Sequence, residues 1–307
     1  MSGPPRQDLV YHVDASYFVF RAYHSMPPDM ADSRGNATHA LYGFARFLSD
    51  LLEAVRPHRI GVAFDSAPRA EPSFRSGIYP AYKANREPPP ADLERQFGLC
   101  REFCRHLGLA QFTSPGYEAD DVIGTLAARV RAAGLCNVLV TRDKDLSQLI
   151  RDGDVFWDYV ANARYAYHDI GPRFGARPER IADFLALTGD AVDNIPGVPG
   201  VGRKTAAELF EAFGSLDDLY ANLDRVPALK LRGAAAVAER LRRHKETAYL
   251  ARRLTGIVCD LPLSVTPDDL RPAAPDLDRL EEFFDEHGFG SVLRRQALRI
   301  ADTARRT

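Results

Sequence analysis

The chain has few cysteines and no regular metal-binding pattern of histidine. Its four cysteines form no CxxC pair, and its eight histidines form no HxxxH pair. Because these residues are the usual zinc ligands, the sequence predicts no zinc site. Cys100 and Cys104 share an apolar helical face and are interpreted as buried thiols in a reducing cytoplasm, with a zinc half-site as the less favoured alternative.

Long apolar runs are also missing. No segment approaches the roughly 20 residues that span a membrane, and residues 1–8 are polar, unlike a secretory signal. The sequence therefore predicts a cytoplasmic protein without a membrane partner. With 307 residues, of which 45% are hydrophobic and 27% charged, the chain has room for one large domain or two smaller ones.

Four short apolar runs each lead towards acidic residues. They cover residues 9–13, 60–64, 109–112 and 138–140. Amphipathic helical patterns lie between them, so the sequence predicts an α/β fold with a mostly parallel, doubly wound sheet. Ligands of such sheets bind outside the carboxyl ends of the strands, where these acids are expected to converge.

The acids near these strand ends, with two more in a later segment, form a candidate metal site. The nine residues are Asp14, Asp65, Glu118, Asp120, Asp121, Asp143, Asp145, Asp190 and Asp193. Three of them open one helix, where solvated helix caps are the alternative interpretation. The last two are three residues apart, as if on one helical turn. Oxygen ligands without histidine or cysteine favour Mg²⁺ or Mn²⁺, and their number suggests two ions.

Residues 66–91 form a long connection that interleaves cations with aromatic residues. These are Arg69, Phe74, Arg75, Tyr79, Tyr82, Lys83 and Arg86. Cations that follow phosphates and aromatics that stack on bases are typical of single-strand binding, and a mobile solvated loop is the alternative. Arg21 is a further phosphate candidate, although a surface ion pair would explain it equally well.

A glycine-rich segment precedes a later helix. It contains Gly197, Gly200 and Gly202, followed by Lys204 and Thr205. The spacing differs from that of a nucleotide P-loop, so ATP binding is not predicted. The pattern indicates a helix–hairpin–helix that grips the DNA backbone without reading its sequence, and a plain tight turn is the alternative.

The net charge of −2 conceals an uneven distribution. Without the nine clustered acids, the remainder of the chain carries +7. Residues 240–253 are rich in arginine, which is interpreted as phosphate contacts or, equally, as solvated helix faces. The sequence therefore predicts a basic surface around one acidic site, as expected for a nucleic-acid-binding protein.

The chain resembles the 5′→3′ exonuclease domain of bacterial DNA polymerase I, a member of the flap endonuclease superfamily. The resemblance extends from about residue 8 to about residue 290. It depends on these motifs: Val-Asp-Ala-Ser-Tyr, Arg-Ala-Tyr-His, Ala-Phe-Asp, Tyr-Lys-Ala-Asn-Arg, Glu-Ala-Asp-Asp-Val-Ile-Gly-Thr-Leu, Thr-Arg-Asp-Lys-Asp-Leu, and the run from Phe-Leu-Ala-Leu-Thr-Gly-Asp to Gly-Val-Gly-Arg-Lys-Thr-Ala.

This resemblance implies a PIN-like (resolvase-like) nuclease domain over residues 1–177 and a helical DNA-binding domain over 178–307. It places a helical arch at about 66–91 and a helix–hairpin–helix at about 195–213. It also implies two Mg²⁺ ions, replaceable by Mn²⁺, held by the nine acids, and a possible K⁺ ion at the hairpin. Residues at phosphate-contacting or arch positions in the family are Arg21, Lys83 and Arg86.

Two departures from polymerase I are apparent. The chain ends near residue 307, so a free-standing exonuclease beside a polymerase acting in trans is expected. The stretch from Asp65 to Phe74 is a few residues longer, which affects the arch. The predicted function is a metal-dependent 5′→3′ DNA exonuclease and flap endonuclease of the nucleoid. The alternatives are a PIN-like ribonuclease and a catalytically inactive DNA-junction binding protein.

Overall fold

A six-stranded sheet forms the centre of the computed structural model, which describes residues 8–66 and 72–304. Its spatial order is β3-β2-β1-β4-β5-β6. The strands are β1 (Leu9–Asp14), β2 (Ile60–Ala63), β3 (Ala110–Phe112), β4 (Cys136–Val140), β5 (Val155–Asp158) and β6 (Ala163–Ala166). All neighbours are parallel except β5 and β6. The predicted α/β class and the four predicted strands are confirmed, whereas β5 and β6 were not predicted.

The order of the strands reverses beside β1. From β1 the chain builds β2 and β3 on one side, and then crosses to β4 and β5 on the other. In a parallel sheet, the crevice outside the carboxyl ends at such a reversal is the usual ligand site. The ends of β1 and β4 are therefore where functional residues should gather.

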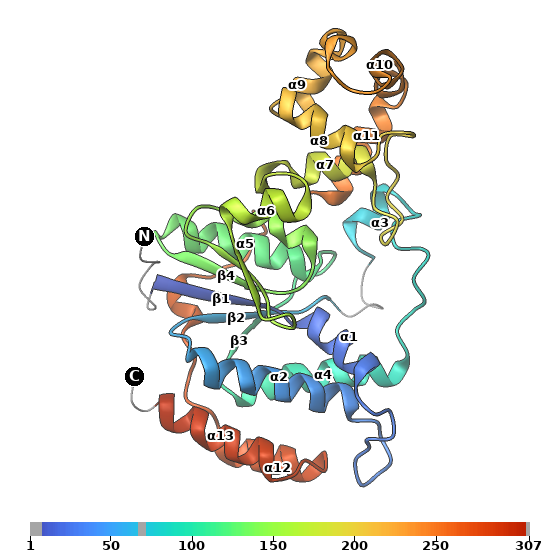
Figure 1. Cartoon of the computed structure of the whole chain (residues 1–307). Coiled ribbons are helices and arrows are strands. Elements are labelled where there is room, and N and C mark those ends of the chain that lie inside the picture. The colour runs from blue at the N-terminus through green and yellow to red at the C-terminus, as the bar shows by residue number, and fades with distance from the viewer. Residues whose placement is uncertain (1–7, 67–71, 305–307) are drawn as a thin grey trace.

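Helices cover both faces of the sheet (Figure 1). The strand period of two sends Tyr11 and Val13 to the core beneath one face, whereas Val10 joins the core of the other. Helices of the first face are α1 (Ala15–Ser25), α2 (His39–Val55) and α4 (Ala91–His106), and those of the second are α5 (Ala119–Ala132) and α6 (Tyr167–Phe174).

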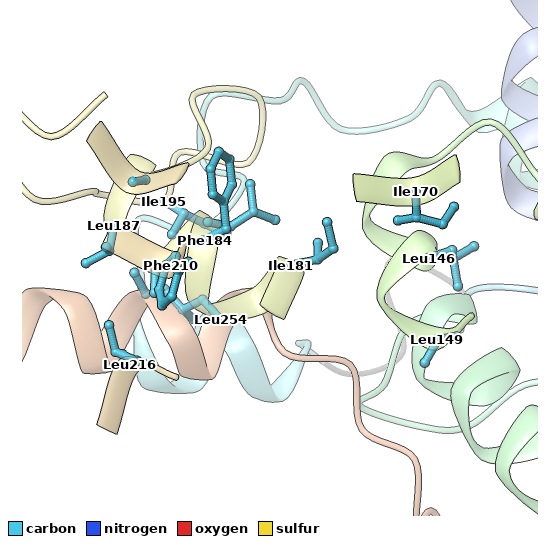
Figure 2. Packing of buried hydrophobic residues seen from close by; sticks show 14 of the residues in the cluster. Leu146, Leu149, Ile170, Ile181, Phe184, Leu187, Ile195, Phe210, Leu216 and Leu254 are labelled. Carbon is cyan, nitrogen blue, oxygen red and sulfur yellow. The ribbon is translucent and has the colours of Figure 1, made fainter. Parts of the chain in front are cut away.

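The second face continues into a helical region above the sheet (Figure 1). The helices there are α7 (Ile181–Thr188), α8 (Arg203–Ala212), α9 (Leu216–Ala221), α10 (Ala234–Arg243) and α11 (Lys245–Thr255). The described residues include the 3-10 helices η2 (Lys144–Leu149), η3 (Pro178–Arg180), η4 (Leu223–Ala228) and η5 (Pro267–Leu270). Figure 2 shows Leu146 and Ile170 on one side of Ile181, and Phe184 and Phe210 on the other. One apolar cluster therefore joins the sheet to the helical region.

The last two helices depart from the predicted second domain. α12 (Leu277–Glu286) and α13 (Ser291–Ala304) lie below α2 and α4, on the side opposite the helical region (Figure 1). Phe283 packs on Phe103, and the amide of Gln296 donates to Asp50 at 2.6 Å. The chain crosses back along the sheet, where Ala273 N donates to Gly108 O at 2.9 Å. Residues 277–304 therefore belong structurally to the nuclease domain.

Candidate active site

Acidic residues gather at the carboxyl ends of β2, β1 and β4. Asp14 ends β1, Asp65 comes two residues after β2, and Asp143 comes three residues after β4. Glu118 is the N-cap of α5, which begins after β3. Because these strands are parallel and adjacent, the acids share one edge of the sheet, at the reversal of strand order.

Asp14 lies at the end of β1 and is buried, with 4% of its surface exposed. Its Oδ1 accepts a hydrogen bond from Tyr17 N at 3.1 Å, and its Oδ2 accepts one from the Thr141 hydroxyl at 2.8 Å. Burial raises the pKa of Asp14 to about 7, and the charges of Asp143 and Asp65 add to the effect. The carboxylate is held in place by the protein, but the protein does not neutralise it.

The pKa values of Asp120 and Asp145 are also raised. Burial raises the pKa of Asp120 well above its usual value, and the charges of Asp143 and Asp14 add to this. Burial also raises the pKa of Asp145 to about 7. Asp145 Oδ1 is buried without a hydrogen-bond partner, and Lys144 Nζ lies 3.9 Å from it. Buried carboxylates that repel one another are stabilised by a divalent cation, so these residues fit a metal.

Other acids of the predicted set have a cation supplied by the protein itself. The pairs are Glu118 with Lys83, Asp121 with Arg75, Asp190 with Lys144, and Asp193 with Arg86. Within residues 8–66 and 72–304, no group of three or more His, Cys, Asp or Glu side chains is close enough to hold an ion. A metal would therefore draw the carboxylates together from the positions seen here.

Lys83 is the cation placed among these acids. Its Nζ donates to Glu118 at 2.8 Å and lies 3.7 Å from Asp193. Burial is the largest single effect and opposes its charge, but Glu118, Tyr82 and Asp193 together outweigh burial and raise the pKa of Lys83, so the ammonium group stays charged. Its backbone has a φ of 53°, and its N–H donates to Asp193 O at 2.9 Å. The backbone therefore holds the ammonium group beside the acidic edge.

The described part of the predicted arch lies against the helical region. It contains α3 (Phe74–Ile78) and a run of turns that follows it. Asn194 Nδ2 donates to Ala81 O at 2.7 Å, and Asn85 Nδ2 donates to the carbonyls of Ala191 and Val192. Residues 72–91 are thus anchored to the 190–195 turn. Arg69 lies outside the described residues.

Two residues predicted to contact DNA are instead buried. Arg75 is 3% exposed and both of its terminal nitrogens bond Asp121. Tyr82 is 6% exposed, and its hydroxyl donates to Glu118 at 3.1 Å. As placed, neither side chain can stack on a base or reach a phosphate. The alternation of cations with aromatic residues made this segment resemble a single-strand-binding surface, whereas packing turns both side chains inward.

The remaining predicted phosphate contacts are accessible. Arg86 is half exposed and pairs with Asp193. Arg21 is exposed on α1, and no hydrogen bond or ion pair joins it to the rest of the described chain. Tyr79 is partly buried against the helical core. Arg21 and Arg86 therefore stay available to an anion at this edge.

The glycine-rich hairpin joins α7 to α8 through a close backbone contact. A Cβ on Gly197 would lie 2.5 Å from Gly189 N, and Gly200 has a φ of +75°. Gly202 is the N-cap of α8, Lys204 is 92% exposed at the side chain, and Thr205 is partly exposed. The hairpin therefore presents backbone and a helix N-terminus to solvent, as a phosphate-binding element requires.

Asp190 and Asp193 do not share a helical turn as predicted. Residues 190 and 195 bridge each other through two backbone hydrogen bonds, so the segment between them is a tight turn. Asp190 faces Lys144, which lies after β4, whereas Asp193 faces Lys83 and Arg86. The two acids therefore contact different sides of the edge.

Three partners of the acids were not identified from the sequence. Thr141 donates to Asp14, Ser16 Oγ accepts from Asp65 N at 2.8 Å, and Lys144 pairs with Asp190. Each lies inside one of the quoted motifs. Hydroxyls and a lysine beside acidic residues were the available signal, but only the folded sheet shows which acid each one contacts.

Two family models match the chain in succession. The model of the 5′-3′ exonuclease N-terminal resolvase-like domain covers residues 9–175, and that of the 5′-3′ exonuclease C-terminal SAM fold covers residues 176–278. The chain belongs to the 5′-3′ exonuclease family. The predicted family is confirmed, and the boundary between the two models falls close to the predicted boundary at 177.

DNA polymerases I are similar to this chain over most of its length. The thermostable DNA polymerase I of Thermus filiformis is 39% identical over 95% of this chain, and DNA polymerase I of Pseudomonas aeruginosa is 40% identical over 92%. These regions cover 33% and 30% of the two relatives. The chain therefore spans about a third of the length of the curated relatives that it matches.

Solved nuclease structures share the fold. The 5′-exonuclease of bacteriophage T5, solved with divalent metal ions (zinc), has a TM-score of 0.65 and 20% identity, covering 96% of this chain and 99% of its own. Human GEN1 with Holliday junction DNA has a TM-score of 0.64 and 15% identity, covering 96% and 72%. The predicted PIN-like sheet with its helical region is confirmed. Among the described helices, none has both the length and the apolar character to cross a membrane.

Proposed function

We propose that the chain is a metal-dependent 5′ nuclease that hydrolyses DNA phosphodiesters at 5′ flaps, nicks and single-strand/duplex junctions. The observation that carries this proposal is the group of carboxylates of Asp14, Asp120 and Asp145, each repelled by Asp143, at the edge of a 5′-3′ exonuclease fold. Two relatives of this fold support it, since T5 enzymes were solved with divalent metal ions and with DNA.

The acidic edge would hold two Mg²⁺ ions, and Mn²⁺ would substitute. Carboxylate oxygens without histidine or sulfur suit these hard cations. Proposed ligands, direct or through water, are Asp14, Asp65, Glu118, Asp120, Asp143, Asp145, Asp190 and Asp193. When bound, such ions activate a water molecule and stabilise the leaving oxygen of an in-line displacement at phosphorus.

The cations of the edge have a separate role in this proposal. Lys83 Nζ, now 2.8 Å from Glu118, would donate to a non-bridging oxygen of the scissile phosphate. Arg21 and Arg86 are exposed and would orient the strand through neighbouring phosphates. A positioned ammonium group stabilises charge that grows on the phosphate in the transition state, so it affects turnover more than binding.

The hairpin at residues 197–202 would bind the duplex part of the substrate through its backbone, and its carbonyl oxygens would hold K⁺, whose positive charge would attract a phosphate. Gly197→Ala tests this, because its new Cβ would meet Gly189 N at 2.5 Å and distort the hairpin. Gly98→Ala, on α4 and outside the hairpin, is the matched control, since nothing lies within 4 Å of its Cβ position. Weaker duplex binding in Gly197→Ala alone, and stronger binding in K⁺ than in Na⁺, are the expected results.

Two further parts of the proposal concern the surroundings of the protein. Relatives of the chain are DNA polymerases I, of which it spans about a third, so we propose that it acts beside a DNA polymerase supplied in trans. The proposed location is the cytoplasm, at the nucleoid. Nick translation by an exonuclease-deficient polymerase, with and without this chain, tests the pairing: longer repair patches are expected when both are present.

Cleavage of a 5′-labelled DNA flap tests the central proposal. A nicked duplex and an RNA flap are compared with it in Mg²⁺, in Mn²⁺ and in EDTA. Cutting near the DNA junction that requires metal is expected, and Asp120→Asn should abolish it. Asp278→Asn, an exposed acid on α12 far from the edge, is the control and should cut normally.

The same assay separates the two rivals. Metal-dependent cutting of the RNA flap, with the DNA flap left intact, would instead identify a ribonuclease. Tight binding of the DNA junction without cutting in either metal would identify a junction-binding protein whose acids have no catalytic role.

A further inference from the structure

A buried ion pair lies behind the acidic edge. Nη1 of Arg75 is 2.7 Å from Asp121 Oδ2, and Nη2 is 2.8 Å from Asp121 Oδ1, so the pair is bidentate. The Arg75 side chain is 3% exposed and that of Asp121 is not exposed. Each of these buried charges is stabilised by the other, because water solvates neither of them.

This pair joins three segments that are far apart in the sequence. Arg75, on α3, also donates through Nε to Leu254 O at 2.8 Å and through Nη2 to Gly256 O at 2.9 Å. Asp121, on α5, accepts Val258 N at 2.9 Å. The start of α3, the start of α5 and the end of α11 therefore meet at one point.

Asp121 also closes the first turn of α5. Its Oδ2 accepts Glu118 N at 3.1 Å, which completes a capping box. Oδ1 therefore accepts from Arg75 and Val258, and Oδ2 accepts from Arg75 and Glu118. Each oxygen already has two donors, so the carboxylate has no position left for an ion.

We propose that Asp121 is the buried counter-ion of Arg75 rather than a metal ligand. Successive helical residues point about 100° apart. Asp120 therefore faces the acids at the edge while Asp121 faces the interior. Only the metal part of this inference rests on the proposed function.

The physical test is a double-mutant cycle in EDTA. Asp121→Asn leaves the Arg75 guanidinium buried without its counter-ion, and Arg75→Gln leaves the carboxylate in the same condition. Each should lower the melting temperature by roughly 5–10 °C. The double variant Arg75→Gln/Asp121→Asn removes both charges and keeps polar groups, so its loss should be clearly smaller than the sum of the two single losses.

The metal arm measures the rise in melting temperature when Mn²⁺ is added. The unchanged protein should show a rise, and Asp120→Asn should lose most of it. Asp121→Asn and the double variant should keep it, as should the surface control Asp278→Asn. If Asp121→Asn does not fold, the double variant answers the same question.

The outcomes separate this inference from the proposed function. Losses that simply add, or a metal-induced rise that disappears in both Asp121→Asn and the double variant, would overturn the counter-ion assignment. If the unchanged protein shows no rise with Mn²⁺ or Mg²⁺, the proposed metal site fails. The coupling within the cycle would then still decide whether Arg75 and Asp121 depend on each other.

Discussion

Two adjacent residues of α5 show how this molecule treats buried negative charge. Asp121 faces the interior, where Arg75 neutralises it with two short hydrogen bonds. Asp120 faces the edge, where burial and the charges of Asp143 and Asp14 raise its pKa. The fold therefore supplies a cation where rigidity is needed and leaves charge uncompensated where an external cation is expected.

The largest expected effect comes from removing an uncompensated acid. Asp120→Asn should lower kcat on the order of 10³-fold, because a charge facing the metals is lost. In EDTA the same variant should melt at a higher temperature than the unchanged protein, since one repelling carboxylate is gone. Single-turnover cleavage and thermal melting measure the two effects. A variant that is inactive and also less stable in EDTA would contradict the interpretation that the charge of Asp120, unlike that of Asp121, is uncompensated.

Lys83→Ala removes a cation that the protein itself supplies to the acidic edge. The ammonium group that neutralises Glu118 would be absent, and with it the proposed donor to the phosphate. We expect kcat to fall roughly 10- to 100-fold, while the affinity for a flap in Ca²⁺ changes much less. Lys230→Ala, a surface lysine of the helical region, is the control. Equal losses in turnover and binding would contradict the role given to Lys83.

The pH dependence of stability distinguishes the two kinds of acid. In the folded state without metal, the pKa values of Asp14 and Asp145 are raised to about 7. A raised pKa means that the folded state binds protons more tightly than the unfolded state. Protonation of these two acids therefore stabilises the folded state fully below about pH 4, and this contribution is lost as the pH rises through 7. The melting temperature in EDTA should fall by roughly 5–10 °C between pH 5 and pH 8. Mg²⁺ should remove most of this decline; an equal decline with and without Mg²⁺ would argue against metal at these acids.

The smallest expected effect concerns Lys144, which is partly exposed and pairs with Asp190. Lys144→Ala adds one more uncompensated acid to the edge. We expect the melting temperature in EDTA to fall by a few degrees and the rise on adding Mn²⁺ to grow. An unchanged response to Mn²⁺ would place Asp190 outside the reach of the metals.

Much of the fold was predictable because its signals are local. Apolar runs at 60–64 and 138–140 became buried strands, and the stripe through Leu41, Phe44 and Leu48 became the inner face of α2. The antiparallel β6 was missed because its alternating exposure gives a weak pattern at the sheet edge. The return of α12 and α13 to the nuclease domain depends on contacts such as that of Phe283 with Phe103, which no local pattern contains.

By itself the sequence determined the class of the fold, the family, and which carboxylates stand at the ends of the strands. Those features follow from periodicity and from motifs within short segments. Only the tertiary structure decided the state of each charge. Asp120 and Asp121 are the same residue type one position apart, yet Asp121 accepts hydrogen bonds from the guanidinium group of Arg75 and from the backbone N–H of Val258. Whether a carboxylate is compensated depends on partners distant in sequence, because electrostatic energy depends on distance in space and on burial.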